Sequence, residues 1–526
     1  MVESGFWLVE AGSIAKALPE TGELAARKRQ LADLFFKASI IISPRVLEEL
    51  SRSEAAYEDA VKLSEYLTKH NIFILDANAL ALWRESVREA SKVIESVGAA
   101  KDAGWKPRSA SLGSVLEISI GQSDVTDQSR CKGTVKDFVA YFSDRFARLS
   151  EPLKMMSTKA PISRIRDAQN TSGKNITVIG MVASRKVTKN GHMLFEIEDM
   201  DTLAPVLVPK DSPLMGQARD LVEDEVASFE VYNSKSLLIA KNLNKPGKIL
   251  QHRTKRLSSR PAKIALISDL HIGSRWFMQQ NFQRFLQFLN GKTTDGEREM
   301  AEDVKYLSIA GDLVDGIGVY PKQERELVTK DIFAQYGIFC DFLKQIPGHI
   351  EVIIIPGNHD AVRVAEPQPA IPLEFIKGVQ GMDNLHFAGN PSIHKVEGLT
   401  LLTYHGTSVD SLIANSPGLR DGYENPQKVA VEMLNKRHLC PMYGEDPIVP
   451  EPRDYLALDF APDIFHFGHV HRNGYANDYN GTVVINSGTF QEQTDYQSNQ
   501  GHIPTPCKVP IYGLDTGILD VIDFNK

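Results

Sequence analysis

The sequence predicts a multidomain protein with an α/β domain in its C-terminal half, an all-β barrel before it, and a small, mainly helical module first. Three observations support this prediction. After residue 260, short apolar runs recur, and each one ends in Asp, Asn or His. Between residues 166 and 250 the hydrophobic period is two, as in strands. Residues 1–95 instead carry apolar side chains at helical spacing.

The composition is that of an ordinary globular protein. Of the 526 residues, 42% are hydrophobic and 24% are charged, and the net charge of −8 gives the whole chain no general attraction for nucleic acid. The four cysteines lack paired spacing, which argues against a zinc ribbon or a disulfide framework and fits a reducing compartment. No apolar run reaches the ~18 residues that cross a membrane, and no signal peptide is recognisable, so we expect a cytoplasmic protein.

The N-terminal module, residues 1–95, is predicted to be mainly helical. Residues 23–36 form one amphipathic pattern, and Pro44 opens a second helix with Ser43 as its cap. A short strand is expected near residues 71–76. Two interpretations remain open: a small independent module, or a module that docks on another subunit.

Residues 96–165 are predicted to be a linker with one ordered helix. The pattern weakens here, with a possible strand near residues 112–118. Residues 135–149 then recover helical spacing and place several aromatic side chains on one face. Such an aromatic stripe is more typical of a protein core than of a groove for a partner.

Residues 166–250 predict an all-β domain. Five strands are expected, and a helix follows the third of them; the strands cover residues 175–182, 193–198, 204–208, 225–231 and 236–242. An Asn-Gly turn joins the first two strands. This order is typical of an OB-fold, a barrel that often binds single-stranded nucleic acid. Because aromatic side chains on these strands are few, a binding barrel and a purely structural barrel both remain open.

A basic connector, residues 251–260, leads into the last domain, residues 260–526. We interpret it as a solvated tether, with contact to a phosphate backbone as the less favoured alternative. Trp276 and Phe277 follow the first strand of this domain, and packing in the core is favoured over stacking on a substrate base.

Side chains that bind metals follow five predicted strands of the last domain. They are Asp269 and His271 after 264–267, Asp312 and Asp315 after 306–309, Asn358 and His359 after 352–355, His405 after 399–403, and His469 and His471 after 464–467. Because open α/β sheets build their sites at the carboxyl ends of strands, we expect these residues to lie together.

This set resembles the calcineurin-like metallophosphoesterases, whose signature D-x-H, G-D-x-x-D, G-N-H-[DE], a lone His and G-H-x-H occurs here in order within residues 263–490. The resemblance implies a β-sandwich flanked by helices and a pair of divalent metal ions. One ion would be bound by Asp269, His271, Asp312 and His471, and the other by Asp312, Asn358, His405 and His469. It also implies that His359 is a proton donor or transition-state stabiliser and not a ligand.

The chemistry of these residue types agrees with that expectation. A bridging carboxylate holds two cations roughly 3.5–4 Å apart, and a water shared between them loses its proton near neutral pH. Mixed imidazole and oxygen ligands favour Mn²⁺, with Fe or Zn as alternatives, over Mg²⁺. Two further carboxylates are candidates for orienting imidazoles: Asp360 for His359, and Asp315 for a histidine ligand.

A second resemblance rests on the OB-like region together with residues 404–408, 447–455, 462–475, 486–491 and 504–510. These stretches are similar to the small subunits of the archaeal family D DNA polymerases. The resemblance implies a 3′→5′ exonuclease that proofreads primer-template DNA during replication. It also implies a heterodimer with a large catalytic polymerase subunit, a sliding clamp as a further candidate partner, and a place at the archaeal nucleoid.

Three alternatives belong to other classes. A repair-type metallonuclease shares the metal signature, but in that family the phosphoesterase domain usually comes first in the chain. A non-catalytic scaffold would have lost ligands, and here all eight ligand and catalytic positions are kept. A protein phosphatase is disfavoured by the OB-like domain. The sequence therefore predicts an active nuclease.

Overall fold

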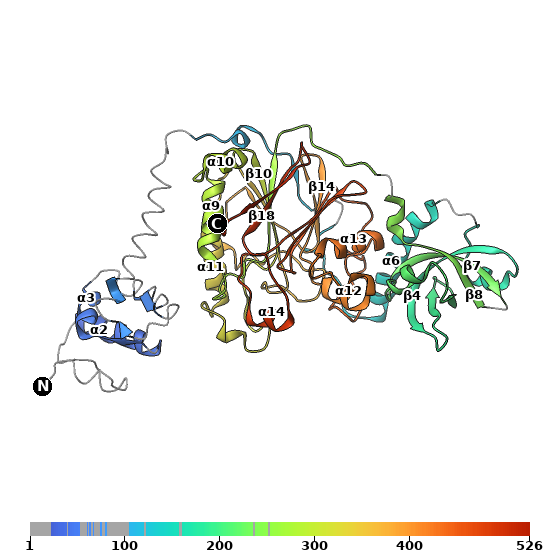
Figure 1. Cartoon of the computed structure of the whole chain (residues 1–526), viewed down its shortest axis with the longest axis horizontal. Helices are drawn as coiled ribbons and strands as arrows, with labels where there is room; N and C mark the ends of the chain where they lie inside the picture. The colour runs from blue at the N-terminus through green and yellow to red at the C-terminus, as the bar shows by residue number, and fades with distance from the viewer. Residues whose placement is uncertain are drawn as a thin grey trace. The chain divides into compact units, whose positions relative to one another are not determined.

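The computed structural model describes residues 23–38, 40–52, 60–61, 63–64, 67, 74–75, 79–81, 105–119, 123–156, 160–234, 237–250 and 253–526. The chain forms two compact units, Met1–Trp105 and Lys106–Lys526, and each is described by itself (Figure 1). The finer division into domains at 1–95, 96–165, 166–250 and 260–526 stays a prediction.

The first unit contains helices where the sequence predicts them. Helices α2 (Glu23–Lys37) and α3 (Pro44–Ser51) are present, and the Ser43 side chain caps α3 by accepting a hydrogen bond from the Val46 amide. Strand β1 (Ile41–Ile42) pairs in parallel with β2 (Ile74–Leu75), within the strand expected at 71–76. The rest of that expected strand lies outside the described residues. Buried Leu, Phe and Val side chains give this unit a core of its own.

The second unit contains the predicted five-stranded barrel. Its strands are β4 (Asn175–Val187), β5 (Met193–Glu198), β6 (Leu203–Val208), β7 (Val226–Ser234) and β8 (Leu237–Asn244), with helix α8 (Met215–Arg219) after the third. They close in the order β4-β5-β6-β8-β7. Alternate apolar side chains fill the interior, among them Val178, Phe195 and Phe229. The five-stranded barrel and its helix are thus confirmed.

Residues 260–526, together with one short earlier strand, build two facing six-stranded sheets. The first has the order β12-β11-β10-β9-β18-β19 and the second β16-β17-β15-β14-β13-β3. The strands are β3 (Leu116–Glu117), β9 (Lys263–Ile267), β10 (Val304–Ala310), β11 (Glu351–Ile355), β12 (Leu385–Phe387), β13 (Ser392–Val396), β14 (Leu399–Tyr404), β15 (Ile464–Phe467), β16 (Asn473–Tyr479), β17 (Thr482–Ser487), β18 (Lys508–Gly513) and β19 (Leu519–Asp523). Side chains from both sheets share one core, so the sheets form a sandwich.

The five strands that carry candidate site residues divide between the two sheets. Strands β9, β10 and β11 are parallel neighbours in the first sheet, and β14 and β15 are parallel neighbours in the second. All of them are almost completely buried, which explains why their sequences are continuous apolar runs.

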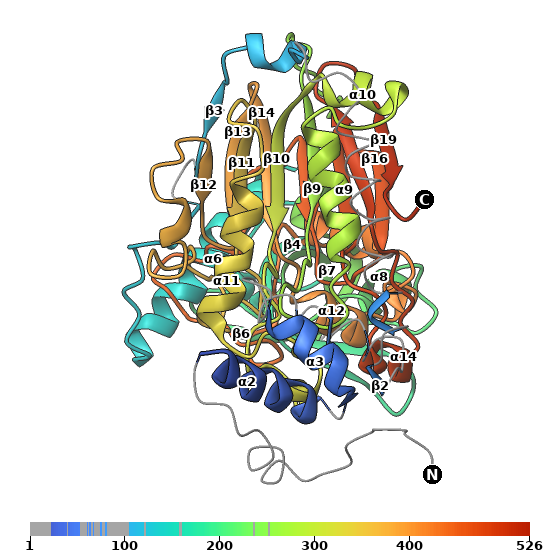
Figure 2. The same ribbon diagram turned by 90° about the vertical axis from the view of Figure 1, so that its left-hand side faces the viewer.

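Helices flank the sandwich. Figure 2 shows α9 (Gln279–Leu289) and α11 (Ile332–Leu343) across the face of the first sheet, with α10 (Asp295–Ala301) near its end. On the second sheet, α13 (Pro426–Lys436) and α12 (Val409–Asn415) pack their apolar faces against β14, β15 and β17. Further short helices are α7 (Ile165–Asn170), α14 (Asp495–Gln500), η1 (Arg108–Ser111), η3 (Pro246–Leu250), η4 (Gln323–Arg325), η5 (Lys377–Val379) and η6 (Pro417–Leu419).

The segment predicted as a linker contributes two elements to the second unit. Strand β3 pairs with β13 at the edge of the second sheet, and the predicted helix becomes α6 (Val135–Met155). In α6, Tyr141 is buried in the core beneath the second sheet, which agrees with the core interpretation of the aromatic stripe. Leu149 and Leu153 of the same helix pack against barrel residues. Helix α6 therefore joins the barrel to the sandwich.

The basic connector is docked on the sandwich and is not a solvated tether. Arg253 and Arg256 both pair with Asp463, and the Arg260 guanidinium lies 3.0 Å from a Glu397 oxygen. The Lys255 ammonium donates to two main-chain carbonyl oxygens. Because these cations are matched within the chain, the connector offers little free charge for a phosphate backbone.

Within the described part of the chain, no helix combines the length and apolar character needed to cross a membrane.

Candidate metal centre

All eight predicted site residues lie at one edge of the sandwich, each at or just after the carboxyl end of its strand. Asp269 and His271 follow β9, Asp312 follows β10, and Asn358 and His359 follow β11, whereas His405, His469 and His471 come from the second sheet. Both sheets therefore contribute to the same site, as the strand-end argument predicts.

One group of side chains surrounds His271. Its Nε2 lies 3.0 Å from Nε2 of His471 and 3.6 Å from Oδ2 of Asp312. Nε2 of His471 lies 3.4 Å from Oδ1 of Asp269. Ligand atoms of Asp269, His271 and His471 all lie within 4.8 Å of one another, close enough to hold one ion.

A second group surrounds His405. Its Nε2 lies 3.4 Å from Oδ2 of Asp312 and 2.9 Å from Oδ1 of Asn358. The ring of His469 lies 5.2 Å from that of His405, measured between centroids. The same oxygen of Asp312 therefore faces both groups, which is the position a bridging carboxylate needs.

The donor set fits two divalent cations. Carboxylate oxygens, an amide oxygen and imidazole nitrogens suit Mn, Fe or Zn better than Mg or Ca. Charges in the cluster are also matched: although burial opposes the shift, the Asp312 carboxylate raises the pKa of His405 to about 10. Burial alone would raise the pKa of Asp312, but the rings of His405 and His359 outweigh this effect and hold that pKa well below its usual range. A bound cation would take the place of these protons.

The backbone at the site is strained. Five of the eight residues have positive φ angles: Asp269 at 53°, His271 at 51°, Asp312 at 50°, His469 at 71° and His471 at 58°. This conformation costs a residue with a side chain of order 1 kcal/mol or more, and such residues cluster at functional sites.

Glycines beside the ligands leave no room for a side chain. A Cβ on Gly311, whose φ is +84°, would lie 2.6 Å from Nδ1 of His405. A Cβ on Gly468 would lie 2.5 Å from Oδ2 of Asp269 and 2.6 Å from Oγ of Ser268. The glycines of the G-D-x-x-D and G-H-x-H motifs thus let the backbone approach the ligands.

Asp315 lies where the sequence suggests an orienting carboxylate. Its Oδ1 is 3.2 Å from Nδ1 of His271, and the amide of Gln323 donates to its Oδ2 at 2.9 Å. The remaining ring nitrogen of His271 is thereby directed at Asp312. Nδ1 of His405 lies 2.9 Å from the Ala310 carbonyl oxygen, which orients that ring in the same way.

The prediction that Asp360 orients His359 is wrong. The Asp360 carboxylate accepts hydrogen bonds from the Gly357 and Leu313 amides and from the Tyr336 hydroxyl. Burial, followed by the nearby Asp312 charge, raises the pKa of Asp360 to about 7. Nδ1 of His359 instead lies 2.8 Å from the main-chain oxygen of Asp315. The side chains of His359 and Asp360 point in different directions, so these two neighbours in sequence do not contact each other through their side chains.

A cavity of about 860 Å³ opens over the centre. Its lining includes His359 and His469 and three tyrosines, Tyr320, Tyr423 and Tyr496. Trp276 and Phe277 do not line it: Phe277 packs against Phe282 and Phe342, in agreement with the core interpretation. The volume is large enough for a ligand of nucleotide size.

Two residues in contact with the candidate ligands were missed in the sequence. Oδ2 of Asp410, in α12, lies 3.1 Å from Nε2 of His469. The side-chain nitrogen of Gln497, in α14, lies 2.7 Å from Nδ1 of His471. Both come from helices outside the motifs, and no local pattern marks them.

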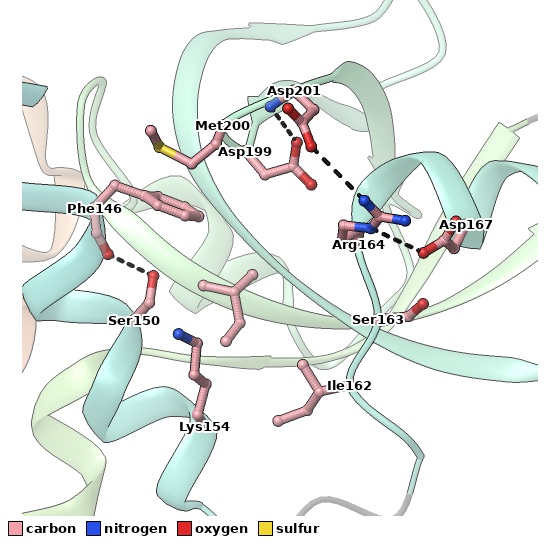
Figure 3. Close-up of a pocket in the computed structure, with 11 residues that line it drawn as sticks. Phe146, Ser150, Lys154, Ile162, Ser163, Arg164, Asp167, Asp199, Met200 and Asp201 are labelled. Atoms are coloured by element: carbon pink, nitrogen blue, oxygen red, sulfur yellow. Dashed lines mark hydrogen bonds and ion pairs between the residues drawn. The ribbon is translucent and has the colours of Figure 1, made fainter. Parts of the chain in front are cut away.

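A second hollow, of about 480 Å³, lies where α6 meets the barrel (Figure 3). Phe146 and Ile179 form apolar parts of its wall, and Arg164 pairs with Asp167 across 3.2 Å. Among the described residues that line it there is no histidine or cysteine, so it lacks the chemistry of the first cavity.

Comparison with known proteins gives consistent matches. Residues 264–474 match the family of the DNA polymerase alpha/epsilon B subunits. The DNA polymerase II small subunit of Methanocaldococcus jannaschii is 40% identical over an alignment of 428 residues that covers 78% of this chain and 71% of the relative. That of Methanothermobacter thermautotrophicus is 37% identical over 410 residues, covering 77% and 82%. That of Archaeoglobus fulgidus is 38% identical over 393 residues, covering 74% and 77%.

Proposed function

Because the chain belongs to the family of archaeal DNA polymerase II small subunits, we propose that it provides the polymerase with a two-metal 3′→5′ exonuclease for proofreading during replication. The observation that carries this proposal is the position of Asp312, whose Oδ2 faces His271 at 3.6 Å and His405 at 3.4 Å. Cleavage at the 3′ end and the large catalytic partner rest on the family resemblance.

The metal assignment extends the same proposal. Asp269, His271, Asp312 and His471 would hold one ion, and Asp312, Asn358, His405 and His469 the other, with Mn²⁺ the best fit to these donors. Two such ions supply a deprotonated water and neutralise charge on the phosphate. We also propose that the sandwich has the calcineurin-like architecture, which its two facing sheets support. The strand order of the barrel supports its assignment as an OB-fold.

His359 is the residue proposed to act on the leaving oxygen. The Asp315 carbonyl can only accept, so Nδ1 of His359 carries a proton and Nε2 is the nitrogen left to meet substrate. Burial lowers the pKa of His359, so the free chain holds the ring neutral. A bound phosphate anion would favour the imidazolium, which can donate a proton from Nε2 to the departing 3′ oxygen.

The partners follow from the same assignment. We expect a heterodimer with the large catalytic subunit, primer-template DNA and single-stranded 3′ ends as substrate, contact with a sliding clamp, and a place at the nucleoid. A non-catalytic scaffold and a repair-type nuclease are the alternatives that the experiment below must separate from proofreading.

The first test is a nuclease assay of the purified chain with Mn²⁺. The substrates are 5′-labelled primers that are matched or mismatched at the 3′ end, and His359→Ala is the inactive control. We expect a ladder that shortens from the 3′ end, is lost with a chelator, returns with added Mn²⁺, and falls by about 10²–10⁴-fold in the variant. Absence of cleavage with any divalent metal, even after the large subunit is added, would favour the scaffold. Cleavage from the 5′ end or within the strand would contradict proofreading.

A further inference from the structure

We propose that Asp410 is a positioning residue for His469, and that Tyr423 in turn fixes Asp410. The proposal rests on the assignment of His469 as a metal ligand. Neither Asp410 nor Tyr423 belongs to the motifs that predicted the site. Asp410 lies in α12, Tyr423 in the loop before α13, and His469 in the loop after β15.

The Asp410 carboxylate determines which nitrogen of His469 carries a proton. Nε2 of His469 lies 3.1 Å from Oδ2 of Asp410. An ionised carboxylate only accepts hydrogen bonds, so this nitrogen must carry a proton. Nδ1 of the neutral ring therefore keeps the lone pair. Since a metal binds the unprotonated nitrogen, Asp410 selects which atom of His469 can act as ligand.

The Asp410 carboxylate is itself held in one orientation. Its two oxygens have separate partners, because Oδ2 faces His469 and Oδ1 accepts from the Tyr423 hydroxyl at 2.9 Å. The ring of Tyr423 lies against that of His502, with 4.2 Å between centroids. The Asp410 side chain is half-exposed, and hydrogen bonds at both oxygens restrict its rotation away from the histidine, so Tyr423 supports His469 through Asp410.

A structural role for Asp410 is the competing explanation. Asp410 lies in the first turn of α12, where a negative charge interacts favourably with the helix dipole. That role predicts a change in stability when the charge is removed. It predicts no change in metal affinity, and no dependence on Tyr423. These two readouts therefore separate the explanations.

The experiment compares Asp410→Asn and Asp410→Ala with Asp295→Asn in the full chain. Asp295 is exposed in the first turn of α10 and does not line the cavity, so it controls for loss of a negative charge near a helix N-terminus. Mn²⁺ binding is measured by calorimetry, and kcat and KM are measured on single-stranded DNA. Loss of a partner that orients a metal-bound histidine typically costs about 10- to 100-fold in metal affinity or activity. We expect Asp410→Ala to lose this much at one of two Mn²⁺ sites and in kcat, with KM for DNA unchanged. Asp410→Asn should lose less, because Asn keeps one acceptor, and Asp295→Asn should match the parent.

A double-mutant cycle tests the link to Tyr423. We expect Tyr423→Phe to weaken the same Mn²⁺ site in the parent chain but to have no further effect when Asp410 is already Ala. Unchanged Mn²⁺ affinity in folded Asp410→Ala would overturn the inference, as would additive effects of the two substitutions. A parent chain that binds Mn²⁺ but cuts no DNA would overturn the proposed nuclease. The role of Asp410 would then still be tested by the Mn²⁺ affinities of the double-mutant cycle. A parent chain that binds no Mn²⁺ would overturn both.

Discussion

At the scale of single residues, the site depends on glycine positions where a side chain would not fit. Gly468 is the clearest case, because its missing Cβ leaves the space that the Asp269 carboxylate occupies. All the candidate ligand residues stood out in the sequence because each lies within a short motif at the end of an apolar run. Asp410 and Gln497 did not, since their contacts arise only when helices from other parts of the chain pack at the cavity.

Gly468→Ala is therefore expected to damage the site while the fold persists. The new methyl group must displace the Asp269 carboxylate or Ser268, and a shift of that size should lower nuclease activity by about 10²-fold. The matched control is Gly337→Ala in α11, where a Cβ meets nothing within 4 Å. That helical substitution should keep full activity and add up to ~1 kcal/mol to the free energy of unfolding. Equal activity of the two variants in the same assay would contradict this account of Gly468.

At the scale of elements, α6 shows what a sequence pattern can and cannot give. Its helical spacing predicted a helix, which is confirmed, and its aromatic stripe predicted a buried face. Tyr141 is buried, whereas Phe138, Phe142 and Phe146 are half-buried. The role of α6 as the junction between barrel and sandwich could not be predicted, because that role depends on an ion pair with a residue 309 positions away. The sequence indicates a possible strand near residues 112–118, and β3 lies there. Its pairing with β13 could not be predicted, because two residues are too few to carry a period.

Arg145 connects α6 to both the sandwich and the barrel. Its guanidinium is fully buried and donates to Asp454 at 2.7 Å, to the Pro441 carbonyl at 2.5 Å and to the Tyr141 hydroxyl at 2.6 Å. It also donates to the carbonyl of Asp224, just before β7 of the barrel, at 3.2 Å. Arg145→Met would leave the Asp454 carboxylate buried without its cation, which should cost about 3–5 kcal/mol.

Denaturant unfolding followed by tryptophan fluorescence measures this loss. On the same helix, Lys154→Ala removes an exposed pair with Glu151 and should change the free energy of unfolding by less than about 0.5 kcal/mol. If Arg145→Met unfolds at the same denaturant concentration as Lys154→Ala, α6 does not hold the two domains together through this pair.

At the scale of the whole molecule, charge governs how the chain meets DNA. The net charge is −8, and the cations of the basic connector are engaged within the fold. We expect the isolated chain to bind DNA with a Kd above about 1 μM at physiological salt, in the range of non-specific binding. Fluorescence anisotropy with a labelled single strand measures this, and addition of the large subunit should tighten binding. Submicromolar binding by the chain alone would refute the expectation.

The order of the barrel strands and of the strands that carry candidate ligands was readable from the sequence, but the assignment of each strand to a sheet was not. Apolar runs identify buried strands without saying which neighbour they pair with, because every buried parallel strand has the same pattern. The two sheets became visible only through their pairing and their common core.

The division of the ligands between two sheets has a consequence for the newly made chain. Asp269 and His271 leave the ribosome about two hundred residues before His471, their partner in the same group. The group around His405 is likewise incomplete until His469 has been made. A nascent or broken chain that ends before β15 would contain most of the ligands and complete neither group. The proposed cleavage of DNA would therefore have to wait until both halves of the sandwich have been synthesised and have closed on each other.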